Sequence, residues 1–326
     1  MRALVISNMR PDAANPGRGS FVRDQVAALR RIDGLEVELC EFGQGPRALA
    51  RVAFELRRRH GPPSTLTRRP ASVPYDVVHA HFGLAAWPAL AVPARVRAVT
   101  VHGTDLAHPR SRLATAPVLG LMQIVAAVSA ALVEELPGRR ARSRAIVLPC
   151  GVDTARFVPM PRAQARAALG LSESDRYVLF PADPARPEKR HDHALALARA
   201  AGVELLALGH VAPRDVPLWV NAADAVVVPS DREGFGLAVL EALACDVPVL
   251  ATPVGIHAEA LAGIPGTLSA PFSLETWGVA LAATLASEDP RVRGRSRATE
   301  HSTDVMAARV HAAWEQALRQ RPHGGG

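Results

Sequence analysis

The stretch from Ala225 to Glu259 constrains the fold more than any other part of the chain. It reads AVVVPSDREGFGLAVLEALACDVPVLATPVGIHAE. The apolar run Ala225–Val228 and the later run Pro248–Ala251 are typical of short buried strands, and LAVLEALA between them predicts a helix. A strand, a helix and a second strand in this order form a βαβ unit, which belongs to an α/β domain with a parallel sheet.

A charged turn that carries glycines joins the first of these strands to the helix. Its residues are Asp231, Arg232, Glu233, Gly234, Phe235 and Gly236. Such a turn presents free backbone N–H groups at a helix N-terminus, which favours a phosphate. Glu233 lies in the turn, and Glu241 lies just over one turn into the helix, where a carboxylate can reach a ribose diol. These residues therefore indicate a nucleotide site.

The stretch resembles the signature of glycosyltransferase family 4, in which E-x7-E contains G-F-G and is followed by E-A-x-A-x-G-x-P-V, a glycine and a glutamate. Asp246 stands where most members have Gly, and Ile256 stands where many have a second Gly. A bare E-x7-E would indicate only an ordinary crossover with surface acids, and the context favours the glycosyltransferase reading. The matching positions are Glu233, Gly234, Phe235, Gly236, Glu241, Ala242, Ala244, Pro248, Val249, Gly255 and Glu259.

Length and composition indicate a soluble globular protein with two domains. The chain has 326 residues, of which 48% are hydrophobic and 21% charged. No apolar run approaches a membrane span, and the N-terminal MRALVISNM enters a strand without a signal peptide. Cys40, Cys150 and Cys245 form no metal or redox spacing. We therefore expect a cytoplasmic protein.

Positive charge is concentrated near the start of the chain. Residues 1–75 contain 13 Arg and no Lys against 7 Asp and Glu, which leaves +6 of the total net charge of +7. Two interpretations remain open: a solvated Arg-rich surface, or a face for an anionic acceptor or for peripheral contact with the anionic inner face of a membrane. No nucleic-acid-binding motif accompanies the charge, so nucleic acid is not an expected partner.

The first domain is expected to be a doubly wound parallel sheet. The loop Asn8–Gly19 follows the first strand, and in the family it faces the acceptor; the alternative is a flexible connection. Pro46–His60 can be helical, and residues 61–74 read as an exposed loop. The expected strands are Ala3–Ser7, Val37–Glu41, Val77–His81, Ala98–His102, Ile124–Ser129 and Ala145–Pro149.

Two segments of this domain place histidines at strand ends. His79 and His81 are two apart on a strand and share a face; a strand H-x-H is a known zinc geometry, but no third ligand is indicated, and lining of the strand end is favoured. In VTVHGTDL the family has a matching H-G-x-D, whose histidine lies beside the donor sugar. His102 is thus expected at the sugar. Asp105 either joins the site or caps the next helix after the bend at Gly103.

The segment LPCGVDTARFVP resembles the family's N-G-V-D-x-x-x-F-x-P, with Cys150 in place of the usual Asn. It marks the passage between domains. We expect an N-terminal acceptor domain over residues 1–158 and a donor domain over 159–302. A helix over about 303–320, apolar on one face, crosses back onto the first domain in the GT-B fold.

Lys189 is the sole lysine of the chain, and it follows a strand of the second domain. A compact ammonium on a flexible stem suits a pyrophosphate oxygen. The family's P-E-K matches here at residues 187–189, whereas its preceding G-R-L does not, so the partner arginine would have to be Arg186. The family usually has a further strand and helix before the signature, and this chain resembles a shorter branch with a trimmed C-terminal domain.

The resemblance implies a GT-B architecture, with two Rossmann-like domains facing a cleft, and a hexosyl-type group 1 transferase. It implies transfer of a sugar from a nucleoside diphosphate sugar to a glycan, lipid-linked or small-molecule acceptor with retention of configuration. Lys189, Arg186 and the helix N-terminus after Gly236 would neutralise the leaving diphosphate. No D-x-D occurs, so neither a metal ion nor a cofactor is expected. The remaining assignments are Glu233 and the backbone near Phe235 for the sugar, Glu241 for the ribose and His102 for the sugar side.

Two other classes stay open. A sugar-nucleotide epimerase shares the GT-B fold, but it needs an acid and a base flanking the sugar and lacks this E-x7-E setting. A non-catalytic sugar-nucleotide-binding partner protein would keep Glu241 and lose the sugar-side groups. Glu233 and His102 are both present, which favours the transferase.

Overall fold

The computed structural model describes residues 1–60 and 74–320. Of the loop expected over residues 61–74, all but Pro74 lies outside the described residues, as does the end of the chain from residue 321. The chain forms two compact units: Met1–Pro11, Arg18–Cys150 and the chain from Asp304 on make up the first, and Asp12–Gly17 and Gly151–Thr303 make up the second.

The first unit is built on a parallel sheet of six strands in the order β2-β1-β3-β4-β5-β6. Each β-rich run predicted from the sequence forms one of these strands. The crossovers on both sides of β1 make the sheet doubly wound. The strands are β1 Arg2–Ser7, β2 Glu36–Glu41, β3 Tyr75–His81, β4 Ala94–Val101, β5 Ile124–Ala127 and β6 Ile146–Val147.

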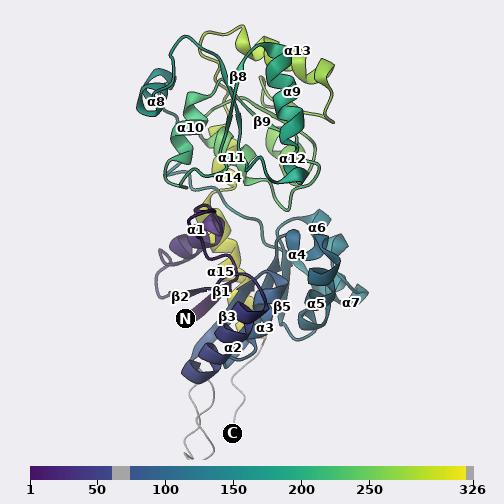
Figure 1. The fold of residues 1–326 in the computed structure, drawn as a ribbon. Helices are drawn as coiled ribbons and strands as arrows, with labels where there is room; N and C mark the ends of the chain where they lie inside the picture. Colours follow the sequence, from purple (N-terminus) through teal and green to yellow (C-terminus); the bar gives the residue numbers. More distant parts are fainter. Residues whose placement is uncertain (61–73, 321–326) are drawn as a thin grey trace, which may run out of the picture. The chain divides into compact units, whose positions relative to one another are not determined.

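Two helices that are distant in sequence, α1 and α15, pack against one face of this sheet. Val22 and Val26 of α1 share a core cluster with Met306, Val310 and Trp314 of α15, and Figure 1 shows α15, in yellow, running beside β1 and β3. The helices of the unit are α1 Ser20–Leu29, α2 Pro46–His60, η1 Gly83–Ala85, α3 Ala86–Ala89, α4 Thr104–Ala107, α5 Pro109–Leu119, α6 Ala130–Glu135, α7 Arg139–Arg144 and α15 Thr303–Arg319.

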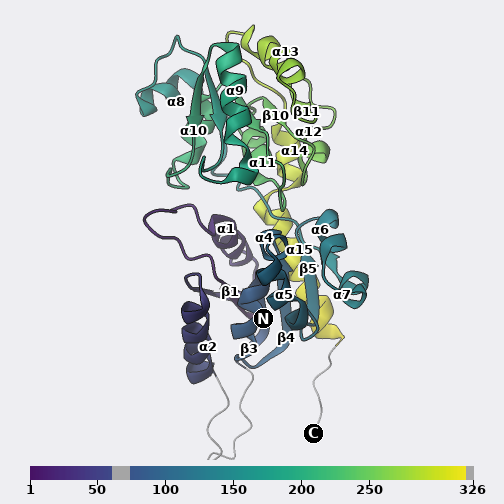
Figure 2. The same ribbon diagram turned by 45° about the vertical axis from the view of Figure 1, so that its right-hand side comes forward.

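The second unit holds a parallel sheet of five strands in the order β11-β10-β9-β7-β8. Its strands are β7 Tyr177–Phe180, β8 Glu204–Ala207, β9 Ala225–Val228, β10 Val249–Ala251 and β11 Leu268–Ser269. Its helices are α8 Arg162–Leu169, η2 Pro187–Lys189, α9 His191–Ala201, α10 Val216–Ala222, α11 Leu237–Ala244, α12 His257–Leu261, α13 Leu274–Leu285 and α14 Arg295–Glu300. Leu197 of α9 and Trp277 of α13 are buried against Val178 and Phe180, and the two helices lie side by side (Figure 2).

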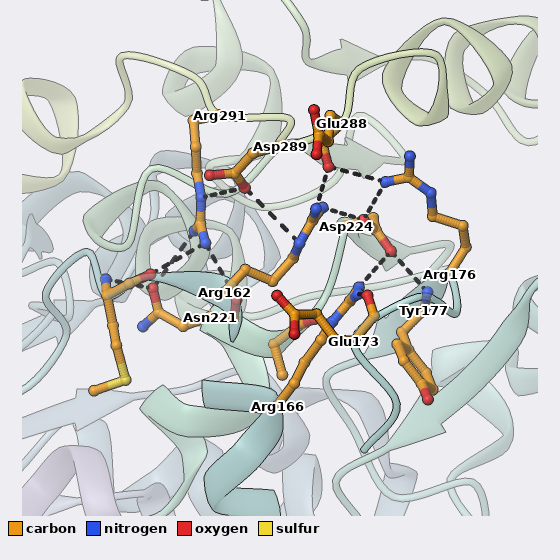
Figure 3. A network of polar contacts seen from close by, with 12 residues as sticks. Arg162, Arg166, Glu173, Arg176, Tyr177, Asn221, Asp224, Glu288, Asp289 and Arg291 are labelled. Carbon is orange, nitrogen blue, oxygen red and sulfur yellow. Dashed lines mark hydrogen bonds and ion pairs between the residues drawn. The ribbon is translucent and has the colours of Figure 1, made fainter. Parts of the chain in front are cut away.

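A buried carboxylate ties several elements of the second unit together. Asp224, with no exposed surface, accepts hydrogen bonds from Arg166 at 2.9 Å, from Arg176 at 3.0 Å and from the backbone N–H of Tyr177 at 2.8 Å, and Arg162 contacts it too (Figure 3). A buried charge is tolerated only when it is paired and hydrogen-bonded. These contacts therefore fix α8 against the start of β7 and the loop before β9.

The second unit begins at Gly151, earlier than the boundary predicted between residues 158 and 159. Val152 already pairs with Ser302 in a parallel bridge, and its N–H donates to the carbonyl of His301 at 2.9 Å. A Cβ on Gly151 would lie 2.7 Å from the carbonyl oxygen of Ser302. The two passages between the units therefore run side by side. Among the helices that the structure describes, none is long and apolar enough to span a bilayer.

Candidate functional site

The turn between β9 and α11 depends on two glycines. Gly236 precedes α11 with φ +104°, and a Cβ there would lie 2.4 Å from Nε2 of His257. Gly255 has φ +60°, and a Cβ there would lie 2.3 Å from the carbonyl oxygen of Phe235. The turn and the segment before α12 thus approach each other at distances that only glycine permits. No side chain of the described residues caps α11, so its first N–H groups can be reached by a ligand.

Lys189 and Glu233 form an ion pair beside this turn. Nζ of Lys189 lies 2.6 Å from each oxygen of Glu233, and the Ser230 hydroxyl donates to Oε1 at 2.8 Å. The two charged side chains are only 13% and 11% exposed. Burial raises the pKa of Glu233, but Lys189, together with His257 and Ser230, outweighs this effect, so the pKa is lowered overall. Glu233 is therefore a carboxylate, and the sequence prediction that both residues belong to one site agrees with this contact.

Arg186 lies in the same loop but turns elsewhere. Its guanidinium donates to Glu188 at 3.0 and 2.7 Å, and 47% of the side chain is exposed. It does not take part in the pair of Lys189 and Glu233. Its assignment to the diphosphate stays a prediction.

The remaining residues predicted for the nucleotide lie on the turn and on α11. Phe235 is buried, and its carbonyl oxygen accepts a hydrogen bond from the N–H of Ile256 at 2.7 Å. Gly234 precedes it in the turn, and Glu241 is partly exposed on α11. The backbone that was predicted to hold the sugar is thus fixed to the segment before α12.

The two departures from the family signature have local explanations. Asp246 has φ +57°, a conformation that glycine and, less often, Asp adopt. Its carboxylate accepts hydrogen bonds from the N–H groups of Gly294 and Arg295, both at 2.9 Å, at the start of α14. Ile256 has φ −90° and needs no glycine. Both substitutions are therefore compatible with the same turn.

His257 is a site residue that the sequence reasoning missed. It is fully buried at the start of α12, and its Nδ1 donates to the carbonyl of Thr252 at 2.9 Å. Burial lowers the pKa of His257, although Glu233 and Thr252 oppose that effect. Nε2 has no hydrogen-bond partner among the described residues and lies against Gly236. A polar residue in the apolar run after Gly255 was the only signal in the sequence.

In the first unit, Asp105 shapes the turn that follows β4. Its carboxylate accepts hydrogen bonds from the backbone N–H groups of His102 at 3.1 Å, Gly103 at 2.9 Å and Gly83 at 3.1 Å. Burial raises the pKa of Asp105 in spite of these bonds. The observed contacts are those of a turn-holding residue, and a direct contact of Asp105 with the ligand stays a prediction.

The histidines of the first unit are held by neighbouring side chains. His79 contacts Thr100 through Nε2 at 2.8 Å and Trp314 through Nδ1 at 3.1 Å. His81 contacts His102 at 2.9 Å, and the rings of His79 and His81 stack at 5.0 Å. Over residues 1–60 and 74–320, no group of three or more His, Cys, Asp or Glu could hold a metal ion.

Gly19, predicted on the acceptor side, begins α1 in a left-handed conformation. Its φ is +71°, and a Cβ there would lie 2.4 Å from the carbonyl oxygen of Met9. Glycine is thus needed where the start of α1 approaches Met9. A contact of this loop with an acceptor stays a prediction.

Comparison with known proteins agrees with this arrangement. Residues 17–156 match the family described as Glycosyltransferase Family 4, and residues 166–301 match Glycosyl transferases group 1. The D-inositol 3-phosphate glycosyltransferase of Actinosynnema mirum is 30% identical, over 84% of this chain and 76% of that protein. The protein of the same name from Jonesia denitrificans is 30% identical, over 94% of this chain and 84% of its own length.

Solved structures share the fold at low sequence identity. A sucrose-phosphate synthase from Thermosynechococcus elongatus has a TM-score of 0.72 at 19% identity, over 98% of this chain and all of that one. Anabaena HepE in complex with UDP-glucose has a TM-score of 0.68 at 16% identity, over 97% of this chain and all of that one. The fold and the turn at Gly236 define a GT-B glycosyltransferase. The chain belongs to glycosyltransferase family 4.

Proposed function

We propose that this glycosyltransferase takes a sugar from a nucleoside diphosphate sugar and transfers it, with retention of configuration and without a metal ion, to an acceptor hydroxyl. The observation that carries the proposal is the pair of Lys189 and Glu233 beside the uncapped start of α11. One site thereby offers an ammonium group and free N–H groups for a diphosphate, and a carboxylate for sugar hydroxyls.

The chemistry asks for charge stabilisation at the leaving group. The bond between the anomeric carbon and the diphosphate oxygen breaks, and the new bond to the acceptor oxygen forms on the same face of the sugar. The acceptor proton passes to the departing phosphate oxygen, so no side-chain base is required. Lys189, Arg186 and the α11 N–H groups stabilise the negative charge that grows on the diphosphate. The positive charge of these groups, together with the lack of D-x-D in the sequence, supports transfer without a metal.

The donor and the acceptor can be narrowed by chemistry. HepE was crystallised with UDP and with UDP-glucose, which makes UDP-sugars the first donors to test, with Glu241 on the ribose and His102 on the sugar. The relatives are named for D-inositol 3-phosphate, and an Arg-rich first unit suits a phosphorylated acceptor. We therefore propose a polar acceptor that carries a phosphate, either free or in a lipid headgroup.

A thermal-shift screen of UDP-, GDP- and dTDP-sugars, followed by an assay of hydrolysis and transfer, tests this function. A donor at 100 times its Kd should add about 2.7 kcal/mol to the free energy of unfolding. Glu241→Ala should weaken the donor and the free nucleotide alike, by roughly 1.5–3 kcal/mol. Transfer should survive EDTA. A donor that is isomerised rather than transferred would establish an epimerase, and binding without turnover would establish a binding protein.

A further inference from the structure

A chain of polar contacts leads from the interior of the first unit to His102. The amide nitrogen of Gln25 on α1 lies 3.3 Å from Nε2 of His81. Nδ1 of His81 lies 2.9 Å from Nε2 of His102, and Nδ1 of His102 lies 4.0 Å from Sγ of Cys150. Gln25 and His81 are buried, and His102 keeps part of its side chain accessible.

The donors and acceptors along this chain follow from the end at Gln25. An amide nitrogen only donates, so Nε2 of His81 accepts. Burial lowers the pKa of His81 to about 3 and that of His102 well below its ordinary value, so both rings are neutral and carry one N–H each. Nδ1–H of His81 then donates to Nε2 of His102. The single proton of His102 is left on Nδ1.

The ring of His102 is also fixed in orientation. Phe21 and Phe82 pack against it with centroid distances of 4.8 and 4.6 Å, and the ring of His81 stacks on it at 5.1 Å. Phe82 adopts φ +74°, which is unfavourable for a residue with a side chain. Backbone strain is thus tolerated where it holds a ring against His102.

We propose that Gln25 and His81 are positioning residues that hold His102 in its Nδ1–H tautomer, so that His102 serves the transferred sugar as a hydrogen-bond donor and never as a base. The proposal rests on the proposed function, in which His102 contacts the sugar. Nε2 of His102 contacts His81, whereas the partner of Nδ1–H among the described residues is the sulfur atom of Cys150 at 4.0 Å. A thiol is a weak acceptor, so a sugar hydroxyl can replace it at little cost. Burial raises the pKa of Cys150 to about 12, so it stays a thiol.

Nuclear magnetic resonance of the ¹⁵N-histidine-labelled protein tests the tautomer without any substrate. His102, assigned with a His102→Asn variant, should show a protonated Nδ1 and an unprotonated Nε2. Gln25→Leu removes the donor that fixes His81, and His102 should then become a mixture of both tautomers. Gln316→Leu, at an exposed position of α15, should leave the spectrum of His102 unchanged.

His79 reports in the same spectra whether the unit is folded. Its proton lies on Nε2 because Trp314 donates to its Nδ1, and that state does not depend on Gln25. If the spectrum of His79 also changes in Gln25→Leu, that variant has lost its fold. Gln25→Met, which keeps the side-chain length, is then used in place of Gln25→Leu. If the Gln25 amide presents its oxygen to His81, every donor in the chain reverses. A protonated Nε2 on His102, or a His102 spectrum that Gln25→Leu and Gln25→Met leave unaltered, overturns the proposal.

Kinetics separate this proposal from the proposed function. Gln25→Leu should lower kcat of transfer about tenfold and leave the affinity for free nucleoside diphosphate within twofold, because the residues proposed to bind the diphosphate belong to the second unit. Absence of transfer in the unaltered protein would refute the proposed function and leave the tautomer measurement valid. An unchanged kcat in a variant with mixed tautomers would refute the role given to Nδ1–H.

Discussion

Lys189 and Glu233 place a positive and a negative group in contact beside the start of α11. Each charge neutralises the other, with Nζ of Lys189 at 2.6 Å from both carboxylate oxygens of Glu233. A bound donor would separate their tasks, with phosphate oxygens at Lys189 and sugar hydroxyls at Glu233. The ion pair thus avoids the cost of burying either charge alone.

Lys189→Ala should lower kcat more than it raises the donor KM, because the positive charge matters most when the diphosphate departs. We expect a loss in kcat of about a hundredfold, the size found when one charge-stabilising group is removed. Steady-state kinetics measure both constants. The same change leaves Glu233 buried without its partner, so a Lys189→Ala, Glu233→Gln double variant serves as the control for folding.

Two further observations bear on the same prediction. Lys189→Arg should rescue only part of kcat, since a planar guanidinium does not replace a compact ammonium. Amine-selective acylation can modify only Lys189 and the N-terminal amine, because the chain has no other lysine. Bound nucleoside diphosphate should protect Lys189. Full turnover of Lys189→Ala would assign the phosphate contact to arginine.

At this scale, the sequence predicted which residues would lie near the turn before α11, and their roles in the chemistry stay predictions. Glu233 and Gly236 stand in the expected turn, and Lys189 reaches Glu233 although 44 positions separate them. His257 was missed because its position follows from its close approach to Gly236. Gln25 was missed because its partner His81 is 56 positions away. Such contacts follow from packing between elements, which a linear pattern does not contain.

Helix α2 is rich in exposed arginine, which is typical of a surface that binds anionic groups. Val52 and Leu56 are buried, whereas Phe54 is 68% exposed. The exposed arginines of this helix are Arg47, Arg51, Arg57, Arg58 and Arg59. A basic helix with an exposed aromatic side chain can lie on a membrane surface. The predicted helix Pro46–His60 agrees in both bounds with α2.

If α2 docks on a membrane, the protein should sediment with vesicles that contain anionic lipid and be released by a few hundred millimolar salt, because exposed charges are screened over about 8 Å at physiological ionic strength. Phe54→Ser should weaken this binding by removing an inserted ring. Val279→Ser on α13 is the matched control, since Val279 is 69% exposed. Equal recovery with neutral and anionic vesicles would leave a solvated Arg-rich surface as the explanation.

For the whole molecule, the sequence predicted two parallel-sheet units and a C-terminal helix with one apolar face. It placed the domain boundary at residues 158 and 159 because Pro159 and Pro161 resemble a linker, whereas the structure changes unit at Gly151, where Val152 pairs with Ser302. Residues 150 positions apart decide that pairing, so local composition could not reveal it. The contact of Trp314 with His79 on β3 likewise joins residues that are far apart in the sequence.

Burial of neutral histidines should make the stability of the first unit depend on pH. Burial lowers the pKa of His81 to about 3 and that of His79 well below its ordinary value. Between about pH 6.5 and pH 3 the unfolded chain therefore binds more protons than the folded one. The free energy of unfolding must fall as pH falls through this window, by about 1.4 kcal/mol per pH unit for each histidine, and stay independent of these groups above it.

Calorimetric unfolding between pH 7.5 and 4.5 (roughly one unit above the ordinary histidine pKa to two below it) measures this slope. His81→Asn removes one titrating ring and should lower the free energy of unfolding of the first unit. The slope of that free energy against pH should decrease by about 1.4 kcal/mol per pH unit below pH 6.5. Gln316→Leu, at an exposed position of α15, changes no histidine and is the control. An identical slope for His81→Asn and the unaltered protein would mean that His81 takes up its proton in the folded state. That result would contradict the neutral histidines inferred for the polar contacts from Gln25 to His102.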